Sequence, residues 1–387
     1  MPDHRLTNSD IVTLTELRQH LHRNPELSGE EAETARLIAG TVAPLGARVI
    51  TGLGGHGVAA IWEGASEGPS VLLRCELDAL PIEETGTPAW RSEISGKGHL
   101  CGHDGHIAML TGVARVLSRQ APKKGRVILM YQPAEEDGAG AAKVVADPRY
   151  PEIAPEWAFS IHNFPGLPMG HVSVKSGPVN CASRGMKITL SGRTAHASQP
   201  ETGTSPMQAI SALMPALTAL SKGTVESPDF TLATVTHARM GEPAFGIAPG
   251  YSEIWVTLRT LVDASMEAMM AKAEALAEAA ARESGLTLSV TYHDVFHHCE
   301  NDPDATARII AAADALGLSS GPDPLPMRGS EDFGRFGMAG AKAAMLFLGS
   351  GETTPALHNP DFDFPDELIP TGTGIFVQIL HDLGIWD

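Results

Sequence analysis

The chain has 387 residues, 43% of them hydrophobic, a length at which two domains are expected rather than one core. Its formal net charge of −18 argues against nucleic acid and anionic membrane as partners, because both select basic surfaces. The start of the chain lacks the apolar core of a signal peptide, no segment is long and apolar enough to span a bilayer, and the four cysteines form no Cys-x-x-Cys pair. These features predict a cytoplasmic protein without a disulfide framework.

In chain order, a helix is predicted over residues 11–23, with Ser9 or Asp10 as its N-cap, and a second over 30–42. Short apolar segments of strand character follow, several of them apolar on both faces, at 58–62, 71–77, 127–131, 157–161 and 343–348. Helical segments lie between them at 106–118 and 139–146. The alternation predicts an α/β domain with a mixed sheet flanked by helices.

Residues 185–296 follow a different pattern. Their predicted elements are a strand (186–190), a helix (205–221), two strands (230–238 and 251–261), a helix (265–284) and a strand (286–295). This βαββαβ order is the split-βαβ, ferredoxin-like arrangement. Because domain insertion succeeds where the ends of the host lie close together, we expect 185–296 to be an inserted domain. Residues 1–184 and 297–387 then form one discontinuous α/β domain.

Metal-ligating residue types follow four of the predicted elements in the host domain. Cys101 and His103 combine a thiol and an imidazole, the mixture that binds borderline metals such as zinc. The other donors come after predicted strands and are Glu135, Glu136, His162 and His358. Sites in open α/β sheets form at the carboxyl ends of strands, so these residues are expected to converge on one metal site.

The adjacent pair Glu135 and Glu136 indicates hydrolytic chemistry. Neighbouring carboxylates repel, and both ionise readily when a cation neutralises one. One can hold the metal while the other accepts a proton from water, whose pKa a bound metal lowers from about 15.7 towards 7. Alternation along 71–77 and beyond puts Arg74, Glu76 and Asp78 on one strand face, and Asp78 is the candidate partner for the second nitrogen of a ligating histidine.

Several motifs in order over nearly the whole chain resemble the M20 metallopeptidase and amidohydrolase family, in particular its aminoacylase, hippurate hydrolase and indoleacetyl-amino-acid hydrolase branch. The matching segments are LDALP at 77–81, CGHDGH at 101–106, QPAEE at 132–136, His162 followed by PGLP at 165–168, AHA at 195–197, GSEDF at 329–333 and LHNP at 357–360. No single motif is specific, but the ordered set is.

The resemblance implies two divalent metal ions per subunit, zinc or manganese, with cobalt or nickel also open. Their ligands would be Cys101, His103, Glu136, His162 and His358. It further implies that Glu135 is the general base, that His196 of the inserted domain polarises the scissile carbonyl, and that Arg259 lies near the substrate carboxylate. The inserted domain would act as a lid and dimerisation surface, giving a homodimer. The implied reaction is deacylation of N-acyl amino acids.

Three departures from the family pattern bear on substrate identity. Glu76 stands where the family often has aspartate, Gly246 replaces an asparagine of the lid motif, and 296–299 (FHHC) replaces a proline-rich exit from the lid. His106 is expected to cap or pack a helix, and His297 with His298 is interpreted as a surface pair. Two alternatives to the amidohydrolase are a dipeptidase-like M20 peptidase and a metal-binding homologue without turnover.

A glycine run at 52–57 offers a further hypothesis. It fits Gly-x-Gly-x-x-Gly, the dinucleotide fingerprint of a nicotinamide-dependent oxidoreductase. That fingerprint requires a helix immediately after the run, whereas residues 58–62 have strand character. A glycine-rich hairpin is therefore the favoured interpretation.

Overall fold

The computed structural model describes residues 5–387, and their contacts divide the chain into two compact units. Unit 1 comprises the described residues up to Val179 together with Glu300–Leu325 and Asp332–Asp387. Unit 2 comprises Asn180–Cys299 and Pro326–Glu331. Each unit is described by itself.

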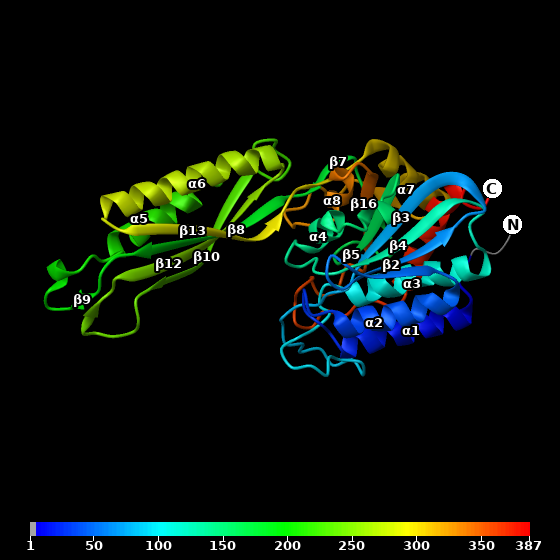
Figure 1. Cartoon of the computed structure of the whole chain (residues 1–387), viewed down its shortest axis with the longest axis horizontal. Helices are drawn as coiled ribbons and strands as arrows, with labels where there is room; N and C mark the ends of the chain where they lie inside the picture. The colour runs from blue at the N-terminus through cyan, green and yellow to red at the C-terminus, as the bar shows by residue number, and fades with distance from the viewer. Residues whose placement is uncertain (1–4) are drawn as a thin grey trace. The chain divides into compact units, whose positions relative to one another are not determined.

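Unit 1 contains a mixed eight-stranded sheet (Figure 1). From edge to edge its strands are β1 (Arg48–Leu53), β2 (Gly57–Glu63), β4 (Lys124–Gln132), β3 (Ser66–Glu76), β5 (Trp157–Phe164), β16 (Lys342–Gly349), β6 (Val172–Ser173) and β15 (Ser320–Gly321). The central strands β4, β3, β5 and β16 run parallel, so their carboxyl ends lie along the same edge of the sheet. The five strands predicted for this domain are confirmed as β2, β3, β4, β5 and β16.

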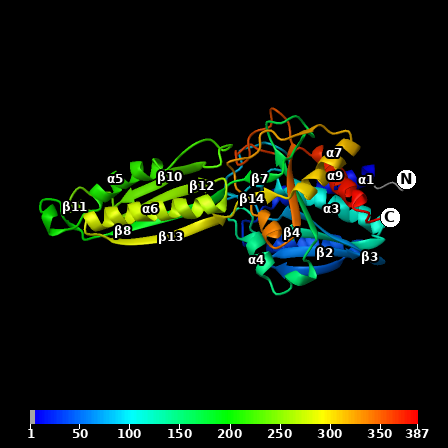
Figure 2. The ribbon, with the colours of Figure 1, turned by 90° about the horizontal axis from the view of Figure 1, so that it is seen from above.

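Helices cover both faces of this sheet, as expected for strands that are apolar on both sides. Alternate β16 residues such as Ala344 and Leu346 join the main core, while Ala343 approaches Gly337 on the opposite face. The main core is shared with α1 (Asn8–Arg23), α2 (Ala32–Val42), α3 (His103–Arg119), α7 (Pro303–Ala315) and α9 (Leu368–Asp382), and Figure 2 shows α1, α3, α7 and α9 together. On the other face lie α4 (Gly140–Ala146) and α8 (Gly334–Met338). Short elements complete the unit and its junctions: η1 (Ala43–Leu45), η2 (Tyr150–Glu152), β7 (Gly177–Asn180) and β14 (Cys299–Asn301).

The starts of α1 and α3 differ from the sequence prediction by three residues each. Neither Ser9 nor Asp10 caps α1. Thr7 is the N-cap: its hydroxyl accepts from the Asp10 N–H, and the Thr7 N–H donates to the carboxylate of Asp10, the N3 member of a capping box. Helix α3 begins at His103 rather than at His106, so one predicted metal ligand lies in its first turn.

Unit 2 is a four-stranded antiparallel sheet with two helices on one face (Figure 1). Its elements are β8 (Ala182–Ser191), β9 (Ala195–His196), η3 (Pro200–Thr202), α5 (Met207–Thr218), β10 (Thr231–Met240), β11 (Ile247–Ala248), β12 (Tyr251–Thr260), α6 (Asp263–Glu283) and β13 (Thr287–Phe296). The order β10-β12-β8-β13 is that of a ferredoxin-like unit and agrees with the predicted βαββαβ sequence of elements. In β12, Ile254, Val256 and Leu258 are buried beneath the helices, whereas Trp255 on the other face is exposed.

The glycine run at 52–57 is a hairpin, as predicted. It joins β1 to β2, which pair in antiparallel fashion, and no helix follows it. Because no helix N-terminus is available there for a pyrophosphate, the nicotinamide hypothesis loses its structural basis. Across residues 5–387, none of the helices combines the length and apolar character needed to cross a bilayer.

Candidate metal centre

All six predicted donors, the five proposed ligands and Glu135, meet at the carboxyl edge of the parallel strands in unit 1. Three overlapping groups have donor atoms within 4.8 Å of one another: Cys101, His103 and His162; Cys101, Glu136 and His358; His103, Glu135 and Glu136. Glu135 and Glu136 lie in the turn after β4, and His358 lies in the segment after β16. His162 lies within β5, which continues to Phe164, and not after the strand as the sequence suggested.

Hydrogen bonds orient two of these histidines toward the cluster. Nδ1 of His103 donates to the backbone oxygen of Asp78 at 2.8 Å, and Nδ1 of His162 donates to the backbone oxygen of Asn163 at 2.8 Å. Each ring is thereby oriented with Nε2 as the nitrogen that faces the cluster. Nε2 of His162 lies 3.5 Å from the Cys101 sulfur, and the buried Nε2 of His103 has no hydrogen-bond partner among the described residues.

Asp78 supports the cluster, although it lies beyond the end of β3 and not on the strand face that was predicted for it. Its carboxylate accepts from the Ser28 hydroxyl at 2.7 Å and from the Glu136 N–H at 2.9 Å. The second oxygen, Oδ1, lies 3.5 Å from Nδ1 of His103. Asp78 therefore contacts one candidate ligand through its backbone and a second through its side chain.

The electrostatics of the cluster fit a divalent cation. Burial opposes a charge on His103, yet the Asp78 hydrogen bond and the carboxylates of Glu76 and Glu136 raise its pKa to about 10. Burial, followed by Glu136 and Glu135, raises the pKa of the Cys101 thiol well above its usual range. Beside burial, the carboxylates near Cys101 and His103 contribute to both shifts, and a cation would neutralise their negative charge. A borderline metal requires sulfur, imidazole and carboxylate donors such as these, and Nε2 of His103 has no hydrogen-bond partner among the described residues.

His106 belongs to a polar network that adjoins the cluster, because a ring nitrogen of His103 lies within 4.8 Å of donor atoms of Glu76 and His106. Its Nδ1 donates to Glu76 at 2.6 Å, and its Nε2 lies 2.6 Å from the side-chain oxygen of Asn163. Glu76 also pairs with Arg74, whose guanidinium reaches Asp332 at 2.8 Å. With both ring nitrogens occupied, His106 packs within α3, as the sequence suggested.

The remaining predicted site residues belong to unit 2. His196 is exposed on β9, where its Nδ1 lies 2.7 Å from the Ser198 hydroxyl. Nη1 of Arg259 donates to the Arg328 backbone oxygen at 2.8 Å and to the Ser330 hydroxyl at 2.9 Å, so this arginine ties residues 326–331 to β12. Both His297 and His298 contact the carboxylate of Asp263, at 2.8 and 3.0 Å.

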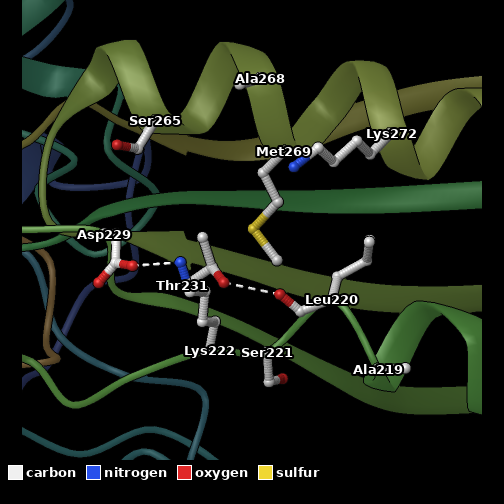
Figure 3. A pocket seen from close by; sticks show the side chains of 10 residues that line it. All are labelled: Ala219, Leu220, Ser221, Lys222, Asp229, Thr231, Ser265, Ala268, Met269 and Lys272. Atoms are coloured by element: carbon white, nitrogen blue, oxygen red, sulfur yellow. Dashed lines mark hydrogen bonds and ion pairs between the residues drawn. The ribbon is translucent and has the colours of Figure 1, made fainter.

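A hollow of about 430 Å³ in unit 2 has a different chemistry (Figure 3). It lies among the ends of α5, β10 and α6, and Figure 3 shows the ion pair of Lys222 with Asp229 beside the side chain of Met269. None of the predicted metal donors is among its lining residues.

Sequence reasoning missed three residues that support the cluster. Ser28 holds Asp78, Asn163 bridges His162 and His106, and the buried Glu31 accepts a hydrogen bond from the Ala134 N–H at 2.8 Å. The signal available for Glu31 was only its place in the first turn of the helix predicted over 30–42. Nothing in its residue type indicates the backbone amide that it binds.

The chain is similar to known proteins over most of its length. Residues 72–382 match Peptidase family M20/M25/M40. The chain is 32% identical to the N-acetyl-L-cysteine deacetylase of Bacillus subtilis (95% of this chain, 91% of that protein) and 30% identical to the IAA-amino acid hydrolase ILR1-like 5 of Arabidopsis thaliana (94% and 85%). Among solved structures, the Bacillus subtilis YXEP protein, described as a dinuclear metal-binding peptidase, is similar with a TM-score of 0.80 and 26% identity over 98% of this chain and 100% of that one. The chain therefore belongs to the M20 peptidase family.

Proposed function

We propose that the protein is a metal-dependent amidohydrolase that cleaves N-acyl amino acids to a carboxylic acid and a free amino acid. The observation that carries the proposal is the convergence of a thiol, imidazoles and two adjacent carboxylates at one strand edge. The deacetylase and amino acid hydrolase named above, similar over most of this chain, support amide bonds of small N-acyl amino acids as the substrate class.

The cluster offers enough donors to hold two divalent ions. Cys101 belongs both to the group with His103 and His162 and to the group with Glu136 and His358. We infer that these five residues are the ligands, with Asp78 supporting His103 and Glu136. Zinc or manganese suits this donor set best, and cobalt or nickel is also compatible.

Glu135 is proposed as the general base. When bound, the metal pair supplies Lewis acidity, which polarises the amide carbonyl and lowers the pKa of water. Glu135 is buried and comes within 4.0 Å of His103, so its carboxylate lies beside the donors. It would take a proton from the attacking water and deliver it to the departing nitrogen.

Two residues of unit 2 are proposed to act on the substrate. His196, whose Nδ1 is engaged with Ser198, would offer Nε2 to the carbonyl oxygen as negative charge develops. Arg259 would attract the substrate carboxylate, although its contacts with Arg328 and Ser330 also give it a structural role. The family resemblance further supports residues 185–296 as a lid and dimerisation domain and the host segments 1–184 and 297–387 as the catalytic domain.

The decisive experiment is a screen of N-acyl amino acids, from acetyl to benzoyl, with dipeptides included, on protein of measured metal content. We expect release of free amino acid from at least one N-acyl compound and its loss on chelation. Glu135→Gln should lower kcat by about 10²–10⁴-fold with metal still bound, because it removes the base and not a ligand.

Glu67→Gln is a suitable control, because Glu67 is an exposed acid of the same unit. Cleavage of dipeptides alone would indicate the peptidase alternative. Tight metal binding without turnover of any compound would indicate a homologue that has lost catalysis, and would refute the proposal.

A further inference from the structure

A buried carboxylate outside the predicted site contacts the turn that carries Glu135 and Glu136. Glu31 immediately precedes α2 and is fully buried. Its Oε1 accepts hydrogen bonds from the backbone N–H groups of Gly29 and Ala134, both at 2.8 Å. Ala134 directly precedes Glu135, so Glu31 binds the backbone N–H one residue before that side chain.

The turn requires a stabilising contact such as the hydrogen bond to Glu31, because its backbone is strained. Ala134 has φ +51°, in the left-handed region that residues other than glycine rarely adopt. A strained residue of this kind costs about 1–3 kcal/mol and persists when its surroundings fix it. The Ala134 carbonyl accepts from the Gly140 N–H at 2.9 Å, and a Cβ on Gly140 would lie 1.7 Å from the Pro133 oxygen. The turn is thus clamped on one side by the start of α4 and on the other by Glu31.

A second carboxylate completes the clamp. Asp78 accepts from the Glu136 N–H at 2.9 Å and is itself held by the Ser28 hydroxyl at 2.7 Å. The N–H groups of the residues before and after Glu135 therefore both donate to carboxylates. Each of these carboxylates also accepts a hydrogen bond from residues 28–29. Burial raises the pKa of Glu31, and its Oε2 has no hydrogen-bond partner among residues 5–387. A carboxylate kept there for packing alone would be costly.

We propose that Glu31 is a positioning residue, which holds Ala134 in its strained conformation and thereby aims the Glu135 carboxylate at the substrate water. The inference rests on the proposed function, in which Glu135 is the base. Glu31 and Asp78 differ in the groups that they contact. Asp78 contacts His103 and Glu136 and so supports metal binding, whereas the contacts of Glu31 are with Gly29 and Ala134.

The test compares substitutions at Glu31 in the metal-loaded, full-length protein. Glu31→Gln keeps an oxygen that can accept both bonds, so its kcat should stay within about threefold of wild type. Glu31→Ala and the shorter Glu31→Asp lose the contact with Ala134, and kcat should fall by about 10–100-fold while KM and metal content stay within twofold. The double variant Glu31→Ala/Ala134→Gly should have a kcat at least threefold higher than that of Glu31→Ala, since glycine adopts positive φ without strain.

Glu33→Ala serves as the matched control, because Glu33 is a neighbouring but exposed acid of α2. Wild-type kcat in Glu31→Ala, equal losses in the Gln and Asp variants, or a loss of metal that accounts for the loss of rate would each overturn the proposal. If Glu31→Ala fails to fold, the Gln and Asp variants decide.

Hydrogen exchange of the peptide spanning 133–138 provides a readout that does not depend on turnover. Exchange should be faster in Glu31→Asp than in wild type, and unchanged in Glu31→Gln and Glu33→Ala. If the wild-type protein hydrolyses no substrate, the proposed function fails while this measurement still tests whether Glu31 holds the turn. Equal exchange in all variants would show that it does not.

Discussion

At the scale of single residues, the ability of a side chain at the candidate centre to bind a metal depends on which of its atoms already have hydrogen-bond partners. His103 and His162 each donate Nδ1 to a backbone oxygen and so present Nε2 to the cluster, whereas His106 has partners at both nitrogens. Three histidines of similar burial therefore differ in what they can bind. The difference comes from backbone oxygens and from Asn163, which residue type and spacing do not reveal.

Gly102 lies between two candidate ligands and has no room for a side chain. It has φ +92°, and an added Cβ would lie 2.2 Å from the Asn163 side-chain oxygen. Gly102→Ala should destabilise the protein by roughly 2–5 kcal/mol, the sum of left-handed strain and overpacking. Metal affinity should fall by about 10–100-fold, because Asn163 contacts His106 and its backbone oxygen holds His162. Urea unfolding and metal titration measure the two effects.

Gly166→Ala separates strain from the clash. Gly166 has φ +91°, but an added Cβ there would have no atom within 4 Å. This control should lose only the conformational part of the stability, about 1–2 kcal/mol, with metal affinity unchanged. Equal losses of stability and metal affinity in both variants would contradict a role for the Asn163 contact.

At the scale of elements, the sequence predicted the strands β2, β3, β4, β5 and β16, the four strands of the unit 2 sheet and six of the helices, because their apolar patterns report burial directly. It did not predict the edge strand β1 or the helices α7, α8 and α9. It was wrong where hydrogen bonds decide: Thr7, and not Ser9 or Asp10, caps α1, and α3 begins three residues before His106. The donors that follow the parallel strands could be anticipated, since sheet geometry brings strand ends together. Ser28 and Glu31 could not, because their partners are a carboxylate far along the chain and a backbone amide.

Helix α1 contacts α3 through buried charges, which gives its docking a pH dependence. Nδ1 of His22 donates to Asp104 at 2.8 Å, and Arg18 lies 3.6 Å from the same carboxylate. Burial disfavours a charged imidazole, but Asp104 and Glu84 outweigh it and raise the pKa of His22 to about 9. The folded-state pKa of His22 lies above the unfolded value of about 6.5, so the protonated imidazole stabilises the folded protein fully below pH 6.5. This stabilisation is lost as the pH rises through 9.

We therefore expect the contribution of His22 to the free energy of unfolding to fall by on the order of 3 kcal/mol between pH 6 and pH 10. Replacing the imidazole in His22→Gln should remove that part of the pH dependence while lowering stability at pH 6. Denaturant unfolding of both proteins across this range measures the difference. His20→Gln is the control, because His20 lies on the same helix and is not buried. An identical pH dependence in wild type and His22→Gln would contradict the argument.

At the scale of the whole molecule, the two units have separate cores. The core of unit 1 joins the central sheet to α1, α2, α3, α7 and α9, whereas that of unit 2 joins its antiparallel sheet to α5 and α6. All five candidate ligands belong to unit 1. Metal binding should therefore stabilise one unit directly and leave the intrinsic stability of the other unchanged.

Calorimetry of the full-length protein with and without a chelator tests this division. Metal at about 1,000 times its dissociation constant stabilises the folded site by about 4 kcal/mol, so chelation should lower the midpoint of the unit 1 transition by several degrees. The transition of unit 2 should not move, because its core contains none of the ligands. Leu213→Ala in α5 and Ile309→Ala in α7, each the loss of a buried side chain, assign the two transitions to unit 2 and unit 1. A single transition that both substitutions and chelation lower together would show that the units unfold as one, and would refute the separation inferred from their cores.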